Sequence, residues 1–183
     1  MKLRLFSLFL VAITIASCSK SKDNVLTTSS TEASKFGAGK SVGKPFSGSI
    51  LYHFSSAFDL SCNCQTYYPA GNFYGTGNLT HLGLSSSKIK PCVAPIYSGG
   101  VYIGNHVGVE CASFVAADGD ELYLSIHPYD ILFTAAGPVG IATVDFAGGT
   151  GKFSSATGSF TGTVSILSAT DASLTVISGT IIY

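Results

Sequence analysis

Two ionisable side chains of this 183-residue chain, His106 and Glu110, are spaced for proton chemistry. They lie four residues apart, so on a β-strand they would share one face, and Gly104 and Gly108 beside them leave room. An imidazole and a carboxylate that face a cavity could hold the polar head of a ligand or move a proton. The alternative is a solvent-facing pair on the outside of a sheet. His81 is a further candidate ligand-binding residue, and its alternative is a buried structural histidine whose ring is satisfied by its neighbours.

Four cysteines, Cys62, Cys64, Cys92 and Cys111, carry a second kind of chemistry. An even number of thiols in an exported chain predicts disulfides. Cys62 and Cys64 are too close to be the preferred mutual pair, so we expect each of them to reach Cys92 or Cys111, and the sequence leaves the pairing open. The Cys-x-Cys spacing is shorter than the two to four intervening residues of usual zinc sites, and we predict no metal and no cofactor.

Known catalytic patterns are missing from the sequence. It contains no HExxH motif, and its sparse carboxylates give no glycosidase pair. The Gly-x-Ser-x-Gly spacing at Gly39 to Gly43 lies in the segment that precedes the β domain, outside any expected strand-to-helix elbow. We therefore assign no catalytic residue and favour a protein without enzymatic activity, while leaving an enzyme open.

The first 17 residues have the features of an export signal. Lys2 and Arg4 are followed by a largely apolar stretch of 12 residues, Leu5 to Ala16, which is too short to span a bilayer of ~30 Å as a helix. The run ends in Ile15-Ala16-Ser17-Cys18, which resembles a bacterial lipobox. That resemblance implies diacylglycerol and palmitate-type acyl chains on Cys18, and a lipid-anchored protein of the bacterial cell envelope, expected at the outer membrane. An ordinary signal peptide with a chance cysteine is the alternative.

Charge separates the next segment from the rest of the chain. Residues 18–44, rich in Ser, Thr, Lys and Gly, hold five lysines against two acidic residues and read as a flexible tether. Residues 45–183 hold three lysines against eight acidic residues, and the only arginine, Arg4, lies in the predicted signal. Phosphate binding needs clustered cations, so we expect no nucleic-acid partner.

Residues 45–183 have the pattern of an all-β domain. Short apolar runs alternate with polar residues at period two between Gly, Asn, Asp and Pro turns, and Leu174 to Tyr183 is apolar on both faces, as expected for a strand paired on both sides. We count about eight strands. Closure removes exposed sheet edges, so a closed antiparallel β-barrel is predicted, with a β-sandwich as the alternative. Gly75 and Gly77 suit bulges or sharp coiling in such a barrel.

Three segments together carry a family resemblance. They are Thr80-His81-Leu82-Gly83, then Ala116 to Leu122, then Gly148-Gly149-Thr150-Gly151-Lys152-Phe153 with Ala156 to Phe160. Over roughly residues 46–183 the series resembles small bacterial lipoprotein β-barrels that are similar to the allene oxide cyclase and dirigent barrels. The resemblance implies an eight-stranded antiparallel barrel and no cyclase activity, since no catalytic residue of that enzyme can be matched here.

The glycine-rich third segment also has a physical interpretation of its own. Gly148, Gly149 and Gly151 would form a tight loop, and Phe153 would fold under it as a plug. A phosphate-cradling loop is the alternative, but it needs a following helix N-terminus.

The expected function is that of a membrane-anchored lipoprotein whose barrel is a binding or structural module for a small apolar ligand. Its 12 Phe and 9 Tyr residues and few charges suit an apolar lumen. Two alternatives stay open: a cyclase- or isomerase-type enzyme that uses a barrel cavity, and an envelope scaffold or partner-binding protein. The oligomeric state also stays open.

Overall fold

The computed structural model describes residues 42–56 and 64–183. The predicted signal peptide, Cys18 and residues 19–41 lie outside this part. The described residues belong to one compact unit, Gly39–Tyr183. None of their helices is long and apolar enough to cross a membrane.

The fold is all-β, as the period-two pattern predicted. Apart from a 3-10 turn η1 (Gly151–Phe153), the regular elements are ten strands: β1 (Lys44–Pro45), β2 (Gly48–Phe54), β3 (Tyr68–Pro69), β4 (Phe73–Leu79), β5 (Gly83–Ser98), β6 (Val101–Val115), β7 (Glu121–Thr134), β8 (Gly137–Gly149), β9 (Thr157–Ile166) and β10 (Asp171–Ile182). The first strand thus begins at Lys44, the last residue of the predicted tether.

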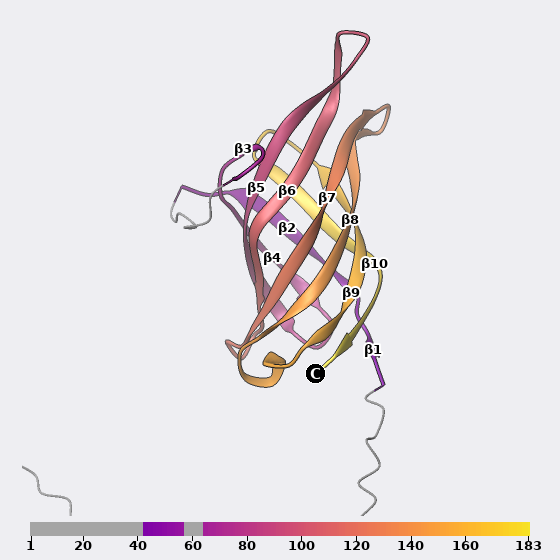
Figure 1. The fold of residues 1–183 in the computed structure, drawn as a ribbon. Coiled ribbons are helices and arrows are strands. Elements are labelled where there is room, and N and C mark those ends of the chain that lie inside the picture. Colours follow the sequence, from indigo (N-terminus) through magenta and orange to yellow (C-terminus); the bar gives the residue numbers. More distant parts are fainter. Residues whose placement is uncertain (1–41, 57–63) are drawn as a thin grey trace, which may run out of the picture. The chain divides into compact units, whose positions relative to one another are not determined.

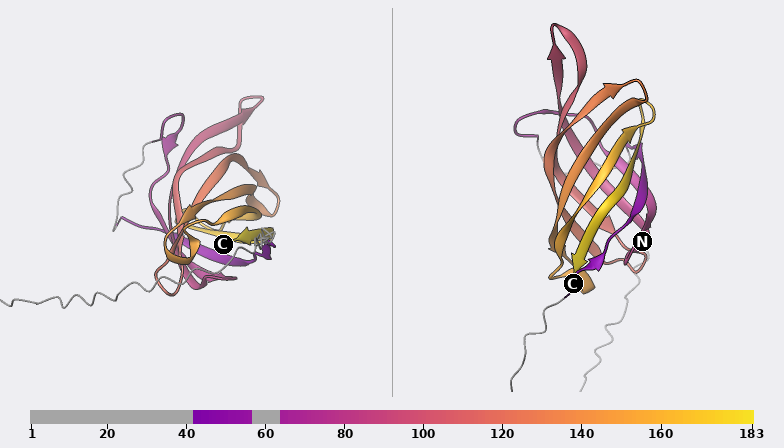
Figure 2. Two further views of the ribbon diagram at one scale, coloured as in Figure 1. Left: turned by 60° about the horizontal axis from the view of Figure 1, so that its bottom comes forward. Right: turned by 90° about the vertical axis from the view of Figure 1, so that its right-hand side faces the viewer.

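All strand pairs are antiparallel, and the pairing order is β1-β10-β2-β4-β5-β6-β7-β8-β9 with β3 added at β5. Strand β10 also pairs with β9 along nearly its whole length. The strands β2, β4, β5, β6, β7, β8, β9 and β10 therefore form a hydrogen-bonded ring (Figures 1 and 2). The expectation that the last strand is paired on both sides is confirmed.

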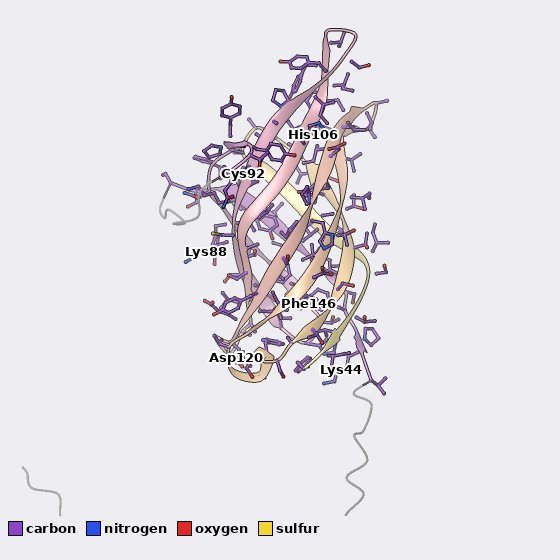
Figure 3. All side chains as sticks on the ribbon, in the orientation of Figure 1. Lys44, Lys88, Cys92, His106, Asp120 and Phe146 are labelled. Atoms are coloured by element: carbon purple, nitrogen blue, oxygen red, sulfur yellow. A yellow bond between two sulfur atoms is a disulfide. The ribbon has the colours of Figure 1, made fainter. Side chains whose placement is uncertain are left out.

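One end of the ring is filled by aromatic side chains, and we call this end the base. Phe46 lies at its centre, with ring centroids 4.9 Å from Phe146 and 5.4 Å from Phe160. Phe114 stacks on the same group, and all four rings are buried. Figure 3 shows Phe146 toward this end of the ring. Edge-to-face and tilted rings at these separations add to the stabilisation that comes from burial alone.

Gly75 and Gly77 meet a different requirement from the predicted bulge. The β4 ladders to β2 and to β5 run without a register shift. A Cβ atom on Gly77 would instead lie 2.0 Å from the carbonyl oxygen of Ser49. Close approach of the β2 backbone therefore excludes a side chain here, while the bulges of the ring fall in other ladders, such as β5–β6 near Lys90 and Pro91.

The glycine-rich segment closes the base. Strand β8 ends at Gly149, η1 follows directly, and Phe153 is fully buried beneath the loop with its ring 5.2 Å from that of Tyr183. A Cβ atom on Gly149 would lie 2.0 Å from the carbonyl oxygen of Glu121. The loop is held by its contacts with the β6–β7 turn, since Glu121 N–H donates to Thr150 Oγ1 over 2.8 Å.

A salt bridge joins the same loop and turn. Lys152 Nζ lies 2.7 Å from Asp118 Oδ2, and Lys152 N–H donates to Asp120 Oδ2 over 2.9 Å. The hydrogen bond between Lys152 and Asp118 lowers the pKa of the carboxyl and raises the pKa of the ammonium. Figure 3 places Asp120 and Lys44 at this end, so the base carries charges on its outside and aromatic rings within.

Candidate functional site

The other end of the ring holds a cavity of about 580 Å³ that is partly open to solvent. We call this end the mouth. The lining comes from all eight ring strands and from their connections at that end. Its members are Tyr52, Ala70, Phe73, Ile89, Pro91, Val93, Asn105, Val107, Tyr129, Ile131, Phe133, Pro138, Val164, Ile166, Leu167, Ser168, Ala169, Asp171 and Ala172.

The cavity narrows toward the base into a second void of about 50 Å³. Tyr52, Ile89 and Tyr129 line both spaces, so they form the floor of the larger cavity. Below them the second void is lined by core residues such as Phe114 and Phe160. The interior therefore changes from filled to hollow along its axis, with the floor residues at the boundary.

Two tyrosine hydroxyls belong to the floor. Tyr52 shares a hydrogen bond of 3.0 Å with the hydroxyl of Ser87, and both side chains are buried. Burial raises the pKa of Tyr52 far above its usual value, and burial also raises the pKa of Tyr129 to about 12. Both hydroxyls are thus neutral at physiological pH. The hydroxyl of Tyr52 is already hydrogen-bonded to Ser87. The hydroxyl of Tyr129 is therefore the floor group that can form a hydrogen bond with a bound molecule.

Asp171 is the charged residue of the described lining, and it lies at the mouth. It accepts hydrogen bonds from Ser168 Oγ and from His53 Nδ1, each over 2.6 Å. These bonds, that from Ser168 above all, lower the pKa of the Asp171 carboxyl. The group is therefore an anion at neutral pH.

The Ser168, Asp171 and His53 cluster is not built as a nucleophilic triad. In such a triad the imidazole lies between hydroxyl and carboxylate, because it must take the proton of the attacking oxygen. Here the carboxylate lies in the middle and binds both partners. The arrangement fixes the β9–β10 turn and leaves the serine without a base.

His106, one member of the predicted pair with Glu110, does not line the cavity. The side chain of His106 is about half exposed on the outer face of β6, and its Nδ1 lies 2.5 Å from Asp130 Oδ1 on β7. Its neighbours Asn105 and Val107 point into the cavity instead. Glu110 lies on β6 where the ladders on both sides shift register, and its side chain lies outside the described part of the structure.

His81 lies at the base, in the turn between β4 and β5, far from the cavity lining. Its Nε2–H donates to the carbonyl of Pro45 over 2.8 Å, and its ring packs edge-on against Tyr183. Its φ of 69° is the one positive value among the described residues other than glycine. His81 therefore joins the first strand to the base; its ring has a hydrogen-bond partner, as in the structural alternative, but it is half-buried rather than buried.

A disulfide between Cys64 and Cys92 resolves part of the open pairing. It ties the β2–β4 connection to the outer face of β5 beside the mouth, where the ring of Tyr67 stacks over His106. The bridge closes a 28-residue separation, which corresponds to about 3–4 kcal/mol in the chain-entropy account. Cys111 is also disulfide-bonded, and Cys62 lies outside the described residues.

The described residues bring together no group of three or more His, Cys, Asp or Glu side chains that could hold a metal ion. His53, His106 and His127 each contact a single aspartate, and the fourth histidine is His81 at the base. The His106 and His127 pairs lie on the outside of the ring, whereas Asp171, the partner of His53, also lines the mouth of the cavity.

The floor and mouth residues were missed by the sequence analysis. Period-two alternation puts Ile50, Tyr52 and Phe54 on one face of a strand, but nothing in the sequence separates hollow from filled positions on that face. Tyr129 and Asn105 follow bulged or proline-containing stretches where the period-two pattern breaks. One feature of the sequence could have indicated these cavity residues: several hairpins contain a long stretch without charged residues.

Comparison with known proteins adds no relative. No protein-family model, no curated protein and no solved structure matches the chain. The assignment of a function therefore depends on the geometry of the cavity and its mouth.

Proposed function

We propose that the ring of strands is a closed β-barrel whose lumen binds a small, uncharged apolar ligand. The observation that carries the proposal is the cavity of about 580 Å³ lined mainly by aliphatic and aromatic side chains. Sites for small molecules usually have volumes of ~300–1,000 Å³ with a few polar groups among apolar ones. Closure is supported by the β9–β10 and β10–β2 ladders, which leave no ring strand with an unpaired edge along its full length.

The base supports a lumen that is open at one end only. A binding cavity inside a small barrel needs a rigid floor, because a ring of eight strands has room for either side chains or one small ligand. The rings of Phe46, Phe114 and Phe160 fill the base, and Phe153 seals it from below. A ligand therefore enters and leaves at the mouth.

The charge distribution selects against anionic ligands. The described lining contains no Lys, Arg or His side chain, so no cation is available to pair with a carboxylate or phosphate in the lumen. An unpaired charge is costly to bury. The ionised Asp171 at the mouth adds repulsion toward an anion. A fatty acid would thus bind less well than the corresponding alcohol.

Two polar side chains are placed to orient a neutral ligand. The hydroxyl of Tyr129 is at the floor and the amide of Asn105 lines the wall. A ligand with one hydroxyl or carbonyl group can hydrogen-bond to either of them. An apolar body with one such group, such as a long-chain alcohol or a polycyclic alcohol, matches the lumen best.

The enzyme alternative is not supported by the lining. All four histidines are described, and none of them lines the cavity. Proton transfer by His106 in the lumen would require its side chain to leave the outer face of β6. Ligand binding needs no such rearrangement.

A pair of fluorescent probes tests the proposal. N-phenyl-1-naphthylamine is neutral, whereas 1-anilinonaphthalene-8-sulfonate has a similar size and carries a sulfonate. We expect saturable enhancement of the first probe and at least about tenfold weaker binding of the second, which corresponds to ~1.4 kcal/mol. Equal affinity for both probes would contradict the charge argument, and no saturable binding of either would contradict the lumen.

A matched pair of variants tests whether the probe binds inside the lumen. Ala172→Phe puts a large side chain on the lumen face of β10, where Ala172 lines both voids. Ala147→Phe adds the same atoms on the exposed outer face of β8. Only the first should abolish binding of the neutral probe while far-UV circular dichroism remains unchanged. Loss of binding in both would show that the probe reports on something other than the lumen.

We also propose that the chain is a lipoprotein anchored through Cys18 in the bacterial outer membrane. What supports this is the signal of residues 1–17 with its lipobox-like end. The likeness to allene oxide cyclase and dirigent barrels is likewise a proposal, supported by the ring order and the glycine-rich loop at the base. Mass spectrometry of the protein from its own host tests the anchor, since an unmodified Cys18 would exclude it.

A further inference from the structure

The mouth lacks charged residues over most of the sequence that forms it. Residues 91–105 at the tip of the β5–β6 hairpin, 131–140 at the tip of β7–β8, and 164–170 at the β9–β10 turn contain no Asp, Glu, Lys, Arg or His. In the β2–β4 connection the described residues 64–73 are also uncharged, and Asp59 lies outside them. The base, by contrast, carries Lys44, Lys152, Asp118 and Asp120.

One hairpin projects beyond the rest of the mouth. Strands β5 and β6 pair with each other as far as Ser98 and Val101, whereas the β6–β7 ladder begins only at Gly104. Figures 1 and 2 show this hairpin standing above the ring. The three residues from Val101 to Ile103 lie beyond that ladder and correspond to a projection of ~10 Å along the strand, and the contact between His106 and Asp130 lies below it.

Exposed aromatic rings lie on this projecting hairpin and on the neighbouring strand β7. The ring of Tyr102 lies 5.9 Å from that of Tyr97 and 4.9 Å from that of Phe133, edge-on. Tyr97 and Val101 are each 64% exposed. Phe133 also lines the cavity, so the exposed rings are continuous with the entrance of the lumen.

We propose that the mouth of the ring docks on the surface of a zwitterionic phospholipid bilayer, with the tip of the β5–β6 hairpin in the headgroup region. Tyr and Phe side chains favour the membrane–water interface, where their apolar bodies are buried and the hydroxyls stay wet. A surface without lysine or arginine has no need of anionic lipids. The contiguous rings Tyr97, Tyr102 and Phe133 differ from the single exposed apolar residues elsewhere, such as Leu84, which need no partner.

The backbone limits the depth of docking. Beyond the β6–β7 ladder the hairpin is only two strands wide, so its outer edges present N–H and C=O groups without strand partners. Such groups cannot enter hydrocarbon without a large cost. The tip therefore lies among hydrated headgroups, and the lumen opens onto the bilayer from which an uncharged apolar ligand would come. Docking itself does not depend on the lumen being occupied.

A single tryptophan tests the docking in the full chain, because the sequence contains no tryptophan. Tyr97→Trp places the reporter on the hairpin, and Leu84→Trp places it on an equally exposed site at the base. With phosphatidylcholine vesicles we expect a blue shift and quenching by brominated phosphatidylcholine for the first variant only. Bromines near the headgroups should quench more than bromines deep in the acyl chains. The Leu84→Trp control accounts for any attachment through the amino-terminal segment.

A second variant links the signal to the surface. Adding Tyr102→Ser and Val101→Ser to Tyr97→Trp should weaken vesicle partitioning at least about tenfold, whereas added salt should not weaken it. The proposal is overturned if brominated lipid quenches both reporters equally or quenches neither. It is also overturned if the blue shift of Tyr97→Trp occurs without vesicles and grows with protein concentration, since the surface would then bind a second copy of the chain.

Discussion

The buried hydrogen bond between Tyr52 and Ser87 provides the sharpest test of the floor of the cavity. The two oxygens are 3.0 Å apart, Ser87 is fully buried, and Tyr52 is 5% exposed. In Tyr52→Phe the Ser87 hydroxyl loses this partner, and an unsatisfied buried hydroxyl costs about 1–3 kcal/mol. In Ser87→Ala the tyrosine hydroxyl borders the cavity, where water can reach it, so we expect a smaller loss of about 0.5–1 kcal/mol.

The double variant Tyr52→Phe/Ser87→Ala should cost less than the sum of the two single variants. Replacing both partners by apolar groups of similar shape removes the bond without leaving an unsatisfied group. We expect a coupling free energy of about 1 kcal/mol. For a domain of this size, 1 kcal/mol corresponds to a change in Tm of about 3–4 °C.

Urea unfolding followed by far-UV circular dichroism measures this cycle, with the disulfides left intact. A matched control cycle pairs Tyr52→Phe with Ser86→Ala, because Ser86 points to the opposite face of β5. The control should be additive within about 0.5 kcal/mol. If the Ser87 cycle is equally additive, the hydroxyls do not share a bond in solution, and Tyr52 would then be as free as Tyr129 to bind a ligand.

Three further predictions concern stability. Gly77→Ala should lower the free energy of unfolding by about 2–3 kcal/mol because its Cβ meets the β2 backbone, whereas Gly43→Ala, with only ordinary contacts, should be nearly neutral in the same chemical denaturation. His81→Ala should cost about 1 kcal/mol through the lost hydrogen bond to Pro45, and His81→Gly should cost less because glycine relieves the positive φ; equal losses would exclude that strain. Above pH 10 the unfolded state loses the proton of Tyr129 while the native state keeps it up to about 12, so this group alone should lower the free energy of unfolding by about 2.7 kcal/mol over that interval; buried Tyr52 adds a decline of its own, and Tyr129→Phe should make the total decline less steep in unfolding curves measured at each pH.

The strands and their antiparallel order follow from local pattern. Residues such as Leu122, Leu124 and Val144 alternate with polar neighbours, and that alternation survives in the structure because each strand has one face toward the interior. The dipeptide Asp118-Gly119 is typical of a primed hairpin turn, which in type I′ needs a positive φ at both residues. Instead only Gly119 has a positive φ, and its N–H donates to the carbonyl of Ala116. Several types of β-turn accept Asp118 and Gly119, so these residues predict that a turn is present but do not predict its type.

The candidate site was harder to predict because it depends on distances between strands. His106 and Glu110 have the residue types of a proton-transfer pair. The bulges near Lys90 and Val109, however, decide which side chains of β6 point into the ring. A bulge inserts one residue, and it exchanges the two faces beyond it. Strict alternation therefore gives no reliable direction on either side of such a point.

The hollow mouth and the filled base differ in the size and number of side chains that point inward at each level of the ring. At the base, four phenylalanines from distant parts of the chain, Phe46, Phe114, Phe146 and Phe160, meet at one level and fill it. At the mouth the inward positions hold smaller or branched residues such as Val93, Val107 and Pro138, which leave the axis empty. The spacing of residues along the sequence does not show which of them lie at the same height along the ring axis, because that height is set by strand tilt and by ladder register. A cavity inside the ring can therefore be deduced only after the register is known. The absence of charged residues around it, in contrast, can be seen in the sequence of three separate hairpins.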